Sequence, residues 1–293
     1  MSNIIARFHK IQVQDGVKVW YREAGAAGNP TILLLHGFPT SSNMFRNLIP
    51  LLAEHFHIIA PDLPGFGFTE TPENYTFSFD SLCESIGYLL DTLRIEKFAM
   101  YIFDYGSPVG FRLALKFPSR ITGIVTQNGN AYEEGLDDRF WGPLKKYWES
   151  YQSDPVFVES LIPYLQDPAN VIRQYHDGVA DIESVDPAAY TLDIALIQRS
   201  GQADIQLRLF FDYQNNIKLY PAFQRFLRDS KIPVLVAWGA NDTIFSVAGA
   251  EAYRKDVDNL KIVYYDTGHF ALETHVVAIA EEIISMLAEN QGY

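Results

Sequence analysis

Hydrophobic residues along this chain fall into short runs that are separated by amphipathic stretches. Residues 11–21 alternate between apolar and polar side chains on either side of Asp15-Gly16, which predicts a β-hairpin. Six later runs are almost continuously apolar: 31–35, 57–60, 98–103, 121–127, 232–238 and 261–265. Strands of this kind are typical of a parallel sheet with both faces covered by helices. With the hairpin, the pattern predicts an α/β fold with about eight strands.

The stretch from 129 to 230 departs from this rhythm, because it contains no strong strand pattern. It is rich in Tyr, Trp and Phe at helical spacing and is interrupted by prolines. We therefore predict a helical cap at 129–230, inserted into a core domain that consists of 1–128 and 231–293. Most of the aromatic residues in this cap are expected to form its own hydrophobic core.

Composition and charge limit the compartment and the partners. The chain has 293 residues, of which 48% are hydrophobic, enough for a large core with a smaller inserted domain. Its formal net charge of −13 repels nucleic-acid phosphates and anionic lipids, so we expect neither nucleic-acid nor membrane partners. The single cysteine, Cys83, cannot form an internal disulfide. The N-terminus lacks a signal-peptide pattern and no apolar run is long enough to span a bilayer, so the sequence predicts a cytoplasmic protein.

Residues of catalytic types follow three of the predicted strands, at the edge where open parallel sheets bind their ligands. Asp104 follows the strand at 98–103 and precedes Tyr105-Gly106 and a helix predicted from about 108 to 117. Asp242 and His269 follow the strands at 232–238 and 261–265. Either aspartate could instead be a helix N-cap. We expect His36 to be a hydrogen-bonded residue of a turn, and the other histidines show no spacing typical of a metal site.

The order nucleophile, acid, histidine is that of the α/β-hydrolases, which the chain resembles over nearly its full length. It is most similar to their branch of epoxide hydrolases and haloalkane dehalogenases. His36-Gly37-Phe38-Pro39 resembles the HGxP motif of this branch, residues 62–67 resemble the loop after its fourth strand, and Asp104-Tyr105-Gly106 resembles its Asp-Trp-Gly elbow. The resemblance implies an α/β-hydrolase fold, a mostly parallel eight-stranded sheet with helices on both faces and an inserted helical cap. It implies no cofactor and no metal.

An aspartate at the elbow has a specific chemical meaning. With a usual pKa of about 3.9 it is ionised at neutral pH, so unlike a serine it needs no base before it attacks. It can attack an sp³ carbon and form an alkyl ester, which water activated by His269 then hydrolyses. Asp242 would hold the imidazole tautomer. The resemblance implies that the backbone N–H groups of Phe38 and Tyr105 stabilise the oxyanion that develops on Asp104.

The leaving group distinguishes the two activities of the branch. An epoxide leaves as an alkoxide and needs an acid, which the epoxide hydrolases supply from two cap tyrosines. A halide commonly takes N–H donors from Trp beside the nucleophile and from a second Trp or Asn. Tyr105 and Phe38 replace these donors, so we predict an epoxide hydrolase. Tyr213 resembles the second tyrosine of that family.

The resemblance implies that the first ring-opening tyrosine is Tyr147 or Tyr151, which are one helical turn apart, and matching Gln152 to a family glutamine favours Tyr147. Tyr151 and Trp148 are also candidates for lining the substrate pocket. Because Trp148 could serve a halide, a haloalkane dehalogenase is the alternative. Another hydrolase or lyase of the fold and a non-catalytic ligand-binding protein are further hypotheses. The aromatic cap predicts a small hydrophobic substrate.

Overall fold

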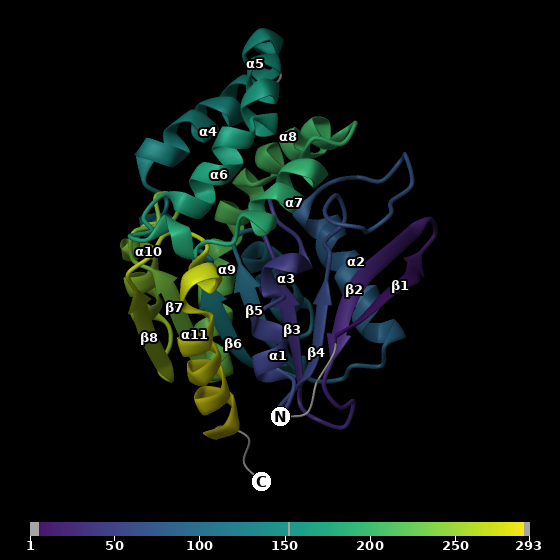
Figure 1. Ribbon diagram of the computed structural model, residues 1–293, viewed down its shortest axis with the longest axis vertical. Coiled ribbons are helices and arrows are strands. Elements are labelled where there is room, and N and C mark those ends of the chain that lie inside the picture. Colours follow the sequence, from purple (N-terminus) through teal and green to yellow (C-terminus); the bar gives the residue numbers. More distant parts are fainter. Residues whose placement is uncertain (1–5, 152, 290–293) are drawn as a thin grey trace.

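The computed structural model describes residues 6–151 and 153–289, and its strands form one eight-stranded sheet. The strands lie in the order β1-β2-β4-β3-β5-β6-β7-β8 (Figure 1). β2 is antiparallel to β1 and to β4, and every other neighbouring pair is parallel. The bounds are β1 (Arg7–Gln14), β2 (Val17–Ala24), β3 (Thr31–Leu35), β4 (His57–Pro61), β5 (Phe98–Phe103), β6 (Ile121–Gln127), β7 (Val234–Gly239) and β8 (Leu260–Tyr265). The predicted α/β architecture is confirmed.

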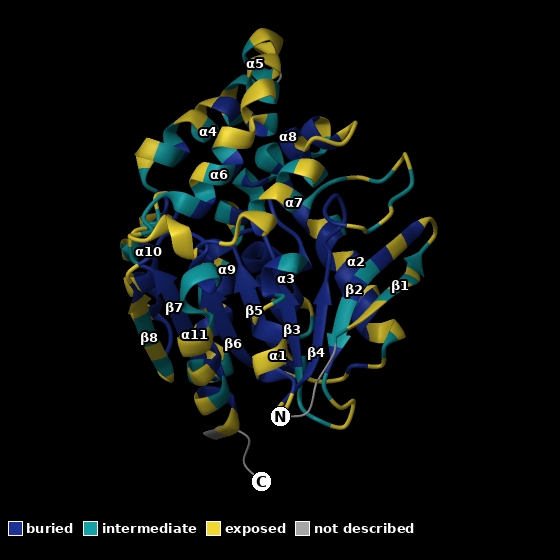
Figure 2. Cartoon of the chain, viewed as in Figure 1, coloured by how far each residue is buried: buried dark blue, intermediate teal, exposed yellow. Residues whose placement is uncertain are grey.

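The central strands are buried on both faces, which explains their uninterrupted apolar sequences. All residues of β4, β5 and β7 are buried, whereas the edge strands β1 and β8 are partly exposed (Figure 2). β7 begins at Val234, later than the predicted 232, because Pro233 has no backbone N–H to contribute to a strand ladder. The hairpin turns at Gly16, whose φ of 75° lies in the left-handed region that glycine adopts readily.

Helices of the core cover both faces of this sheet. α11 contacts α1 and crosses in front of the sheet in Figure 1, whereas α2 contacts α3. The bounds are α1 (Leu48–Leu52), α2 (Phe79–Thr92), α3 (Gly106–Lys116), α10 (Val247–Ala252) and α11 (Ala271–Glu289). α3 starts at Gly106 rather than at about 108, because the turn at Asp104 leads directly into its first residue.

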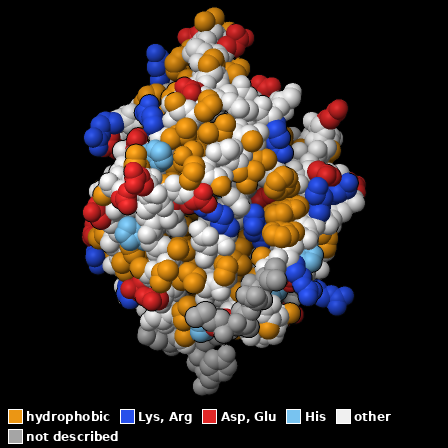
Figure 3. Space-filling view, in the orientation of Figure 1, with side chains coloured by type: hydrophobic (Ala, Val, Ile, Leu, Met, Phe, Trp, Pro, Cys, Tyr) orange, Lys and Arg blue, Asp and Glu red, His pale blue; other side chains and the backbone are white. Residues whose placement is uncertain are grey.

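The segment between β6 and β7 is helical, as predicted. Its helices are α4 (Asp138–Ser150), α5 (Pro155–Gln166), α6 (Pro168–His176), α7 (Pro187–Ile197), α8 (Gln202–Asp212) and α9 (Gln214–Ser230). α4 to α8 lie above one edge of the sheet, and α9 contacts α3 of the core on its way to β7 (Figure 1). Many of the cap's aromatic side chains are fully buried, including Trp141, Tyr147 and Tyr213. Others, such as Tyr164, reach the surface, where hydrophobic side chains occupy much of the cap (Figure 3).

Local sequence signals set where the cap helices begin. In α5, α6 and α7 an aspartate side chain accepts a backbone N–H of the first turn, and proline occupies the first helical position. The three pairs are Asp154-Pro155, Asp167-Pro168 and Asp186-Pro187. Of the helices that the structure describes, none is both long and apolar enough to cross a membrane.

Candidate active site

Asp104 occupies a tight turn between β5 and α3. Its backbone φ is 45°, in the left-handed region that few residues other than glycine, asparagine and aspartate adopt. A Cβ atom on Gly37 would lie 2.3 Å from Oδ1 of Asp104, and one on Gly106 would lie 2.3 Å from the carbonyl oxygen of Leu35. Both positions therefore require glycine, and their lack of side chains lets the turn lie directly against the loop after β3.

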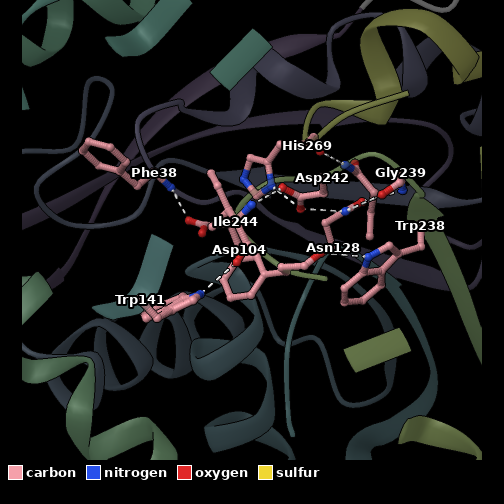
Figure 4. A network of polar contacts seen from close by, with 11 residues as sticks. Phe38, Asp104, Asn128, Trp141, Trp238, Gly239, Asp242, Ile244 and His269 are labelled. Atoms are coloured by element: carbon pink, nitrogen blue, oxygen red, sulfur yellow. Dashed lines mark hydrogen bonds and ion pairs between the residues drawn. The ribbon is translucent and has the colours of Figure 1, made fainter. Parts of the chain in front are cut away.

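Two backbone N–H groups point at the Asp104 carboxylate. The N–H of Phe38 donates to Oδ1 at 2.6 Å (Figure 4). The N–H of Tyr105 also hydrogen-bonds to the carboxylate. Burial raises the pKa of Asp104 to about 6, although the attraction of His269 and these two N–H groups acts in the opposite direction. The two donors can equally hold the oxygen of a carboxyl derivative when negative charge develops on it.

His269 lies between two carboxylates. Its Nδ1 is 2.8 Å from Oδ2 of Asp242, and Figure 4 shows the ring between Asp242 and Asp104. Burial lowers the pKa of His269, but attraction by Asp242 and Asp104 outweighs burial, so the pKa lies above its usual value. Among the described residues, Nε2 of His269 has no hydrogen-bond partner. The imidazole is therefore oriented on one side and available to take a proton on the other.

Asn128, at the end of β6, is a positioning residue that the sequence analysis did not single out. Its Nδ2 donates to Oδ2 of Asp242 at 2.7 Å, and its Oδ1 accepts the N–H of Gly239 at 2.9 Å (Figure 4). The other oxygen of Asp242 accepts the N–H of Ile244 at 2.7 Å. Asp242 is thus held by donors on both oxygens. A polar residue directly after a buried parallel strand is the signal that could have revealed Asn128.

His36 is a structural residue, as expected. Its Nε2 accepts the N–H of Leu63 at 2.9 Å, which leaves the proton on Nδ1 to donate to the carbonyl of Gly37 at 3.0 Å. Burial lowers its pKa to about 4, so the ring is neutral at physiological pH. Within the described part of the chain, no group of three or more His, Cys, Asp or Glu side chains could hold a metal ion.

Two contacts fix the cap over the acid and the histidine. The indole N–H of Trp141, in α4, donates to the carbonyl of Ile244 at 2.8 Å (Figure 4). Tyr175, in α6, stacks on Phe270 with ring centroids 3.9 Å apart and planes 6° apart. Ile244 and Phe270 lie beside Asp242 and His269 in the chain. The cap therefore contacts the chain next to the acid and next to the histidine.

Asp104 opens into a cavity of about 90 Å³ between the core and the cap. The lining is largely apolar and includes Phe38, Tyr105, Trp141, Leu165, Phe210 and Ile244. A neighbouring cavity of about 330 Å³ shares Phe140, Tyr164, Leu165, Arg173 and Phe210 with it. The two cavities are therefore adjacent, and both have a mostly apolar lining.

The two tyrosines that the sequence proposes for ring opening are buried, and their hydroxyls are already engaged. The hydroxyl of Tyr147 donates to the carbonyl of Leu207 at 2.8 Å, and its ring lines the neighbouring cavity. The hydroxyl of Tyr213 shares a hydrogen bond with that of Tyr220. Neither tyrosine lines the cavity at Asp104. Gln152, which favoured Tyr147 over Tyr151, lies outside the described residues.

The two further pocket candidates lie against other parts of the cap. The indole N–H of Trp148 donates to the carbonyl of Phe210 at 2.7 Å. Tyr151 stacks on Phe211, with ring centroids 3.9 Å apart. Neither ring lines either of the two cavities. The cap residues that line the cavity at Asp104 include Trp141 and Phe210, whose roles the sequence did not indicate.

Comparisons with known proteins agree with this fold. A family model described as the alpha/beta hydrolase fold matches residues 30–276. An uncharacterized hydrolase of Saccharomyces cerevisiae is 94% identical over 290 residues, 99% of this chain and 100% of the relative. A haloalkane dehalogenase of Mesorhizobium japonicum is 29% identical, covering 92% of this chain and 87% of that protein. The structure of the epoxide hydrolase CorEH has a TM-score of 0.77 at 20% identity and covers 97% of this chain and 99% of its own. The chain therefore belongs to the α/β-hydrolase fold family and is a hydrolase that is similar to haloalkane dehalogenases and epoxide hydrolases.

Proposed function

We propose that this hydrolase opens epoxides to vicinal diols through an ester on Asp104. The observation that carries the proposal is a buried carboxylate, rather than a hydroxyl, at the elbow, held by the N–H groups of Phe38 and Tyr105. The hydrophobic cavity above it suits a small apolar substrate. The hypothesis of a non-catalytic binding protein accounts less well for the proximity of His269, Asp242 and Asp104.

In the first step, the carboxylate of Asp104 attacks an epoxide carbon. The C–O bond breaks, its electron pair stays on the ring oxygen, and that oxygen becomes an alkoxide that needs a proton. In the second step, Nε2 of His269 takes a proton from water, and the hydroxide attacks the ester carbonyl. The oxyanion forms beside the N–H groups of Phe38 and Tyr105. As it collapses, the proton of the added hydroxyl passes to the departing oxygen, which releases the diol and restores the carboxylate.

The proposed proton donors for the alkoxide are the cap tyrosines Tyr213 and Tyr147. Each hydroxyl already has a hydrogen-bond partner, so each must exchange that partner for the substrate oxygen. A substrate that extends from Asp104 into the neighbouring cavity would meet Tyr147, which lines that cavity. Changing either tyrosine to Phe therefore tests its contribution directly.

A haloalkane dehalogenase is the alternative, and the identity with such an enzyme favours it. Stabilisation of a departing halide requires N–H donors that face the nucleophile. In this structure the indole N–H groups of both Trp141 and Trp148 donate to backbone carbonyls. Trp141, the cap tryptophan that lines the cavity at Asp104, would have to break its bond to bind a halide, as the cap tyrosines would to bind an epoxide oxygen. The epoxide remains the better substrate because Tyr105 and Phe38 stand where the dehalogenases commonly have their N–H donors.

The experiment that tests the proposal compares the two leaving groups. A styrene-type epoxide and a panel of bromoalkanes are incubated with the purified protein, and diol and bromide are measured. We expect diol formation that disappears in Asp104→Asn, with little bromide released from any bromoalkane. Bromide release at a comparable or higher rate, lost in the same variant, would replace the proposal with the dehalogenase alternative.

The pH dependence of the two steps follows from the two raised pKa values. Attack needs the Asp104 carboxylate, which protonates below about pH 6 because burial raises its pKa. Ester hydrolysis needs neutral His269, whose pKa lies above its usual value. As the pH is lowered, hydrolysis is therefore lost before attack is. We expect kcat/KM to fall roughly tenfold per pH unit below about pH 6, and kcat to decline from a higher pH when hydrolysis limits turnover. An acid limb of kcat/KM near pH 4 would contradict the buried carboxylate.

A further inference from the structure

The hydroxyl of Tyr105 stands out among the polar groups near Asp104. Tyr105 is 2% exposed, and among the described residues its hydroxyl oxygen has no hydrogen-bond partner. Burying a hydroxyl without a partner costs folding free energy, so such groups are rare unless something binds them. The ring also lines the cavity into which Asp104 opens.

Neighbouring aromatic rings hold this ring in place, and none of the described residues accepts a hydrogen bond from its hydroxyl. Aromatic rings surround it at centroid distances between 5.0 and 6.2 Å: Phe38, Phe66, Phe79, Phe210 and Tyr213. Burial raises the pKa of Tyr105 well above its usual value, and Asp104 and Tyr147 act in the same direction. The phenol therefore stays protonated at neutral pH and keeps its ability to donate.

Tyr105 differs in this respect from the two cap tyrosines. The hydroxyl of Tyr147 donates to the carbonyl of Leu207, and that of Tyr213 bonds to Tyr220. A donor with no partner need not break a bond before it meets an incoming acceptor. The backbone N–H of Tyr105 hydrogen-bonds to the Asp104 carboxylate, and the residue lines the cavity into which that carboxylate opens.

We propose that Tyr105 is a catalytic residue whose unpartnered hydroxyl donates to the oxygen of the opening epoxide. The inference rests on the proposed function, since it assigns a proton donor to the first step. As the C–O bond breaks, its electron pair moves to the ring oxygen, and that oxygen takes the Tyr105 proton. The phenolate is reprotonated through solvent by the proton that His269 removes from water in the second step, so the protons balance.

The test measures ring opening separately from ester hydrolysis and from folding. Tyr105→Phe is combined with His269→Gln, and the first-order rate of alkyl-enzyme formation is followed by intact mass. We expect this rate to fall roughly tenfold to a hundredfold relative to His269→Gln alone, as for the loss of a hydrogen bond to a charged group. We expect the melting temperature to stay the same or rise, because the variant removes an unpartnered buried hydroxyl.

The matched control is Tyr265→Phe in the same background. Tyr265 is buried in β8, and its hydroxyl is likewise without a partner among the described residues, but the ring does not line the cavity at Asp104. Removal of the Tyr265 hydroxyl should leave the alkylation rate unchanged. Tyr147→Phe and Tyr213→Phe, measured alongside, show whether the cap tyrosines share the role.

The outcomes separate this inference from the function on which it rests. If the otherwise unmodified protein forms neither diol nor an adduct with epoxides, the proposed function fails. If it forms diol and Tyr105→Phe alkylates at the parent rate, only the role of Tyr105 is overturned. A Tyr105→Phe protein that melts at a much lower temperature would also overturn it, because the hydroxyl would then be a structural group.

Discussion

His269→Gln is expected to react once with an epoxide and then stop as the alkyl ester. Asp104 is ionised above about pH 6 and needs no base to attack, so ring opening should continue in the variant. Hydrolysis needs a group that takes a proton from water, and glutamine cannot do so. Loss of a general base lowers this step by roughly 10² to 10⁴-fold, which is enough for the ester to accumulate. Intact mass should rise by the mass of one substrate molecule.

Peptide mapping locates the adduct, and Asp242→Asn provides the graded comparison. The adduct should lie on the peptide that contains Asp104. Asp242→Asn should slow the same second step, because the imidazole loses the carboxylate that orients it at 2.8 Å. A serine-type hydrolase would show the opposite behaviour, since loss of its base blocks the first step. An inactive His269→Gln protein that binds substrate but carries no adduct would contradict the two-step mechanism.

Asp104→Asn is expected to abolish both steps while leaving the fold intact. Asparagine tolerates the φ of 45° at this turn, and its amide oxygen can still accept the N–H of Phe38. The amide cannot attack the substrate, so turnover should fall by on the order of 10⁴-fold or more. No adduct should form, even when His269 is also replaced.

The same variant should be more stable than the parent protein at neutral pH. Because burial raises the pKa of Asp104 to about 6, the folded protein loses stability as pH rises from about 4 to about 6 and the buried group ionises. Asparagine has no such loss, so its advantage should be absent near pH 4 and reach on the order of 3 kcal/mol above pH 6. Thermal melts at pH 4.5 and pH 8 measure the difference. A melting temperature lower than that of the parent at pH 8 would contradict the account of a destabilised carboxylate.

Much of the fold could be predicted because the core strands are buried on both faces. Runs such as 98–103 and 121–127 indicate a parallel sheet that is covered on both faces, and the structure reproduces both ranges. The boundary near Pro233 shifted because proline ends a hydrogen-bond ladder, a local rule that the apolar pattern does not contain. The strand-end positions of Asp104, Asp242 and His269 followed from the same regularity.

The side chains around the triad were harder to predict, because their partners are distant in sequence. Nothing in the neighbourhood of Tyr147 indicates that its hydroxyl donates to the carbonyl of Leu207, or that Trp148 donates to that of Phe210. Asn128 reaches Asp242 across 114 positions of the chain. Such bonds depend on how the cap helices pack on the core, which residue periodicity does not specify.

A single turnover in ¹⁸O-labelled water tests the central claim, a covalent ester on Asp104, most directly. Enzyme in excess over epoxide is quenched after one round, and label is measured in the diol and in the peptide that contains Asp104. Water attacks the ester carbonyl, so the account predicts label in the Asp104 carboxylate and unlabelled diol in the first turnover, with labelled diol only in later ones. Labelled diol in the first turnover together with an unlabelled Asp104 peptide would show that water attacks the epoxide directly, and would contradict the account.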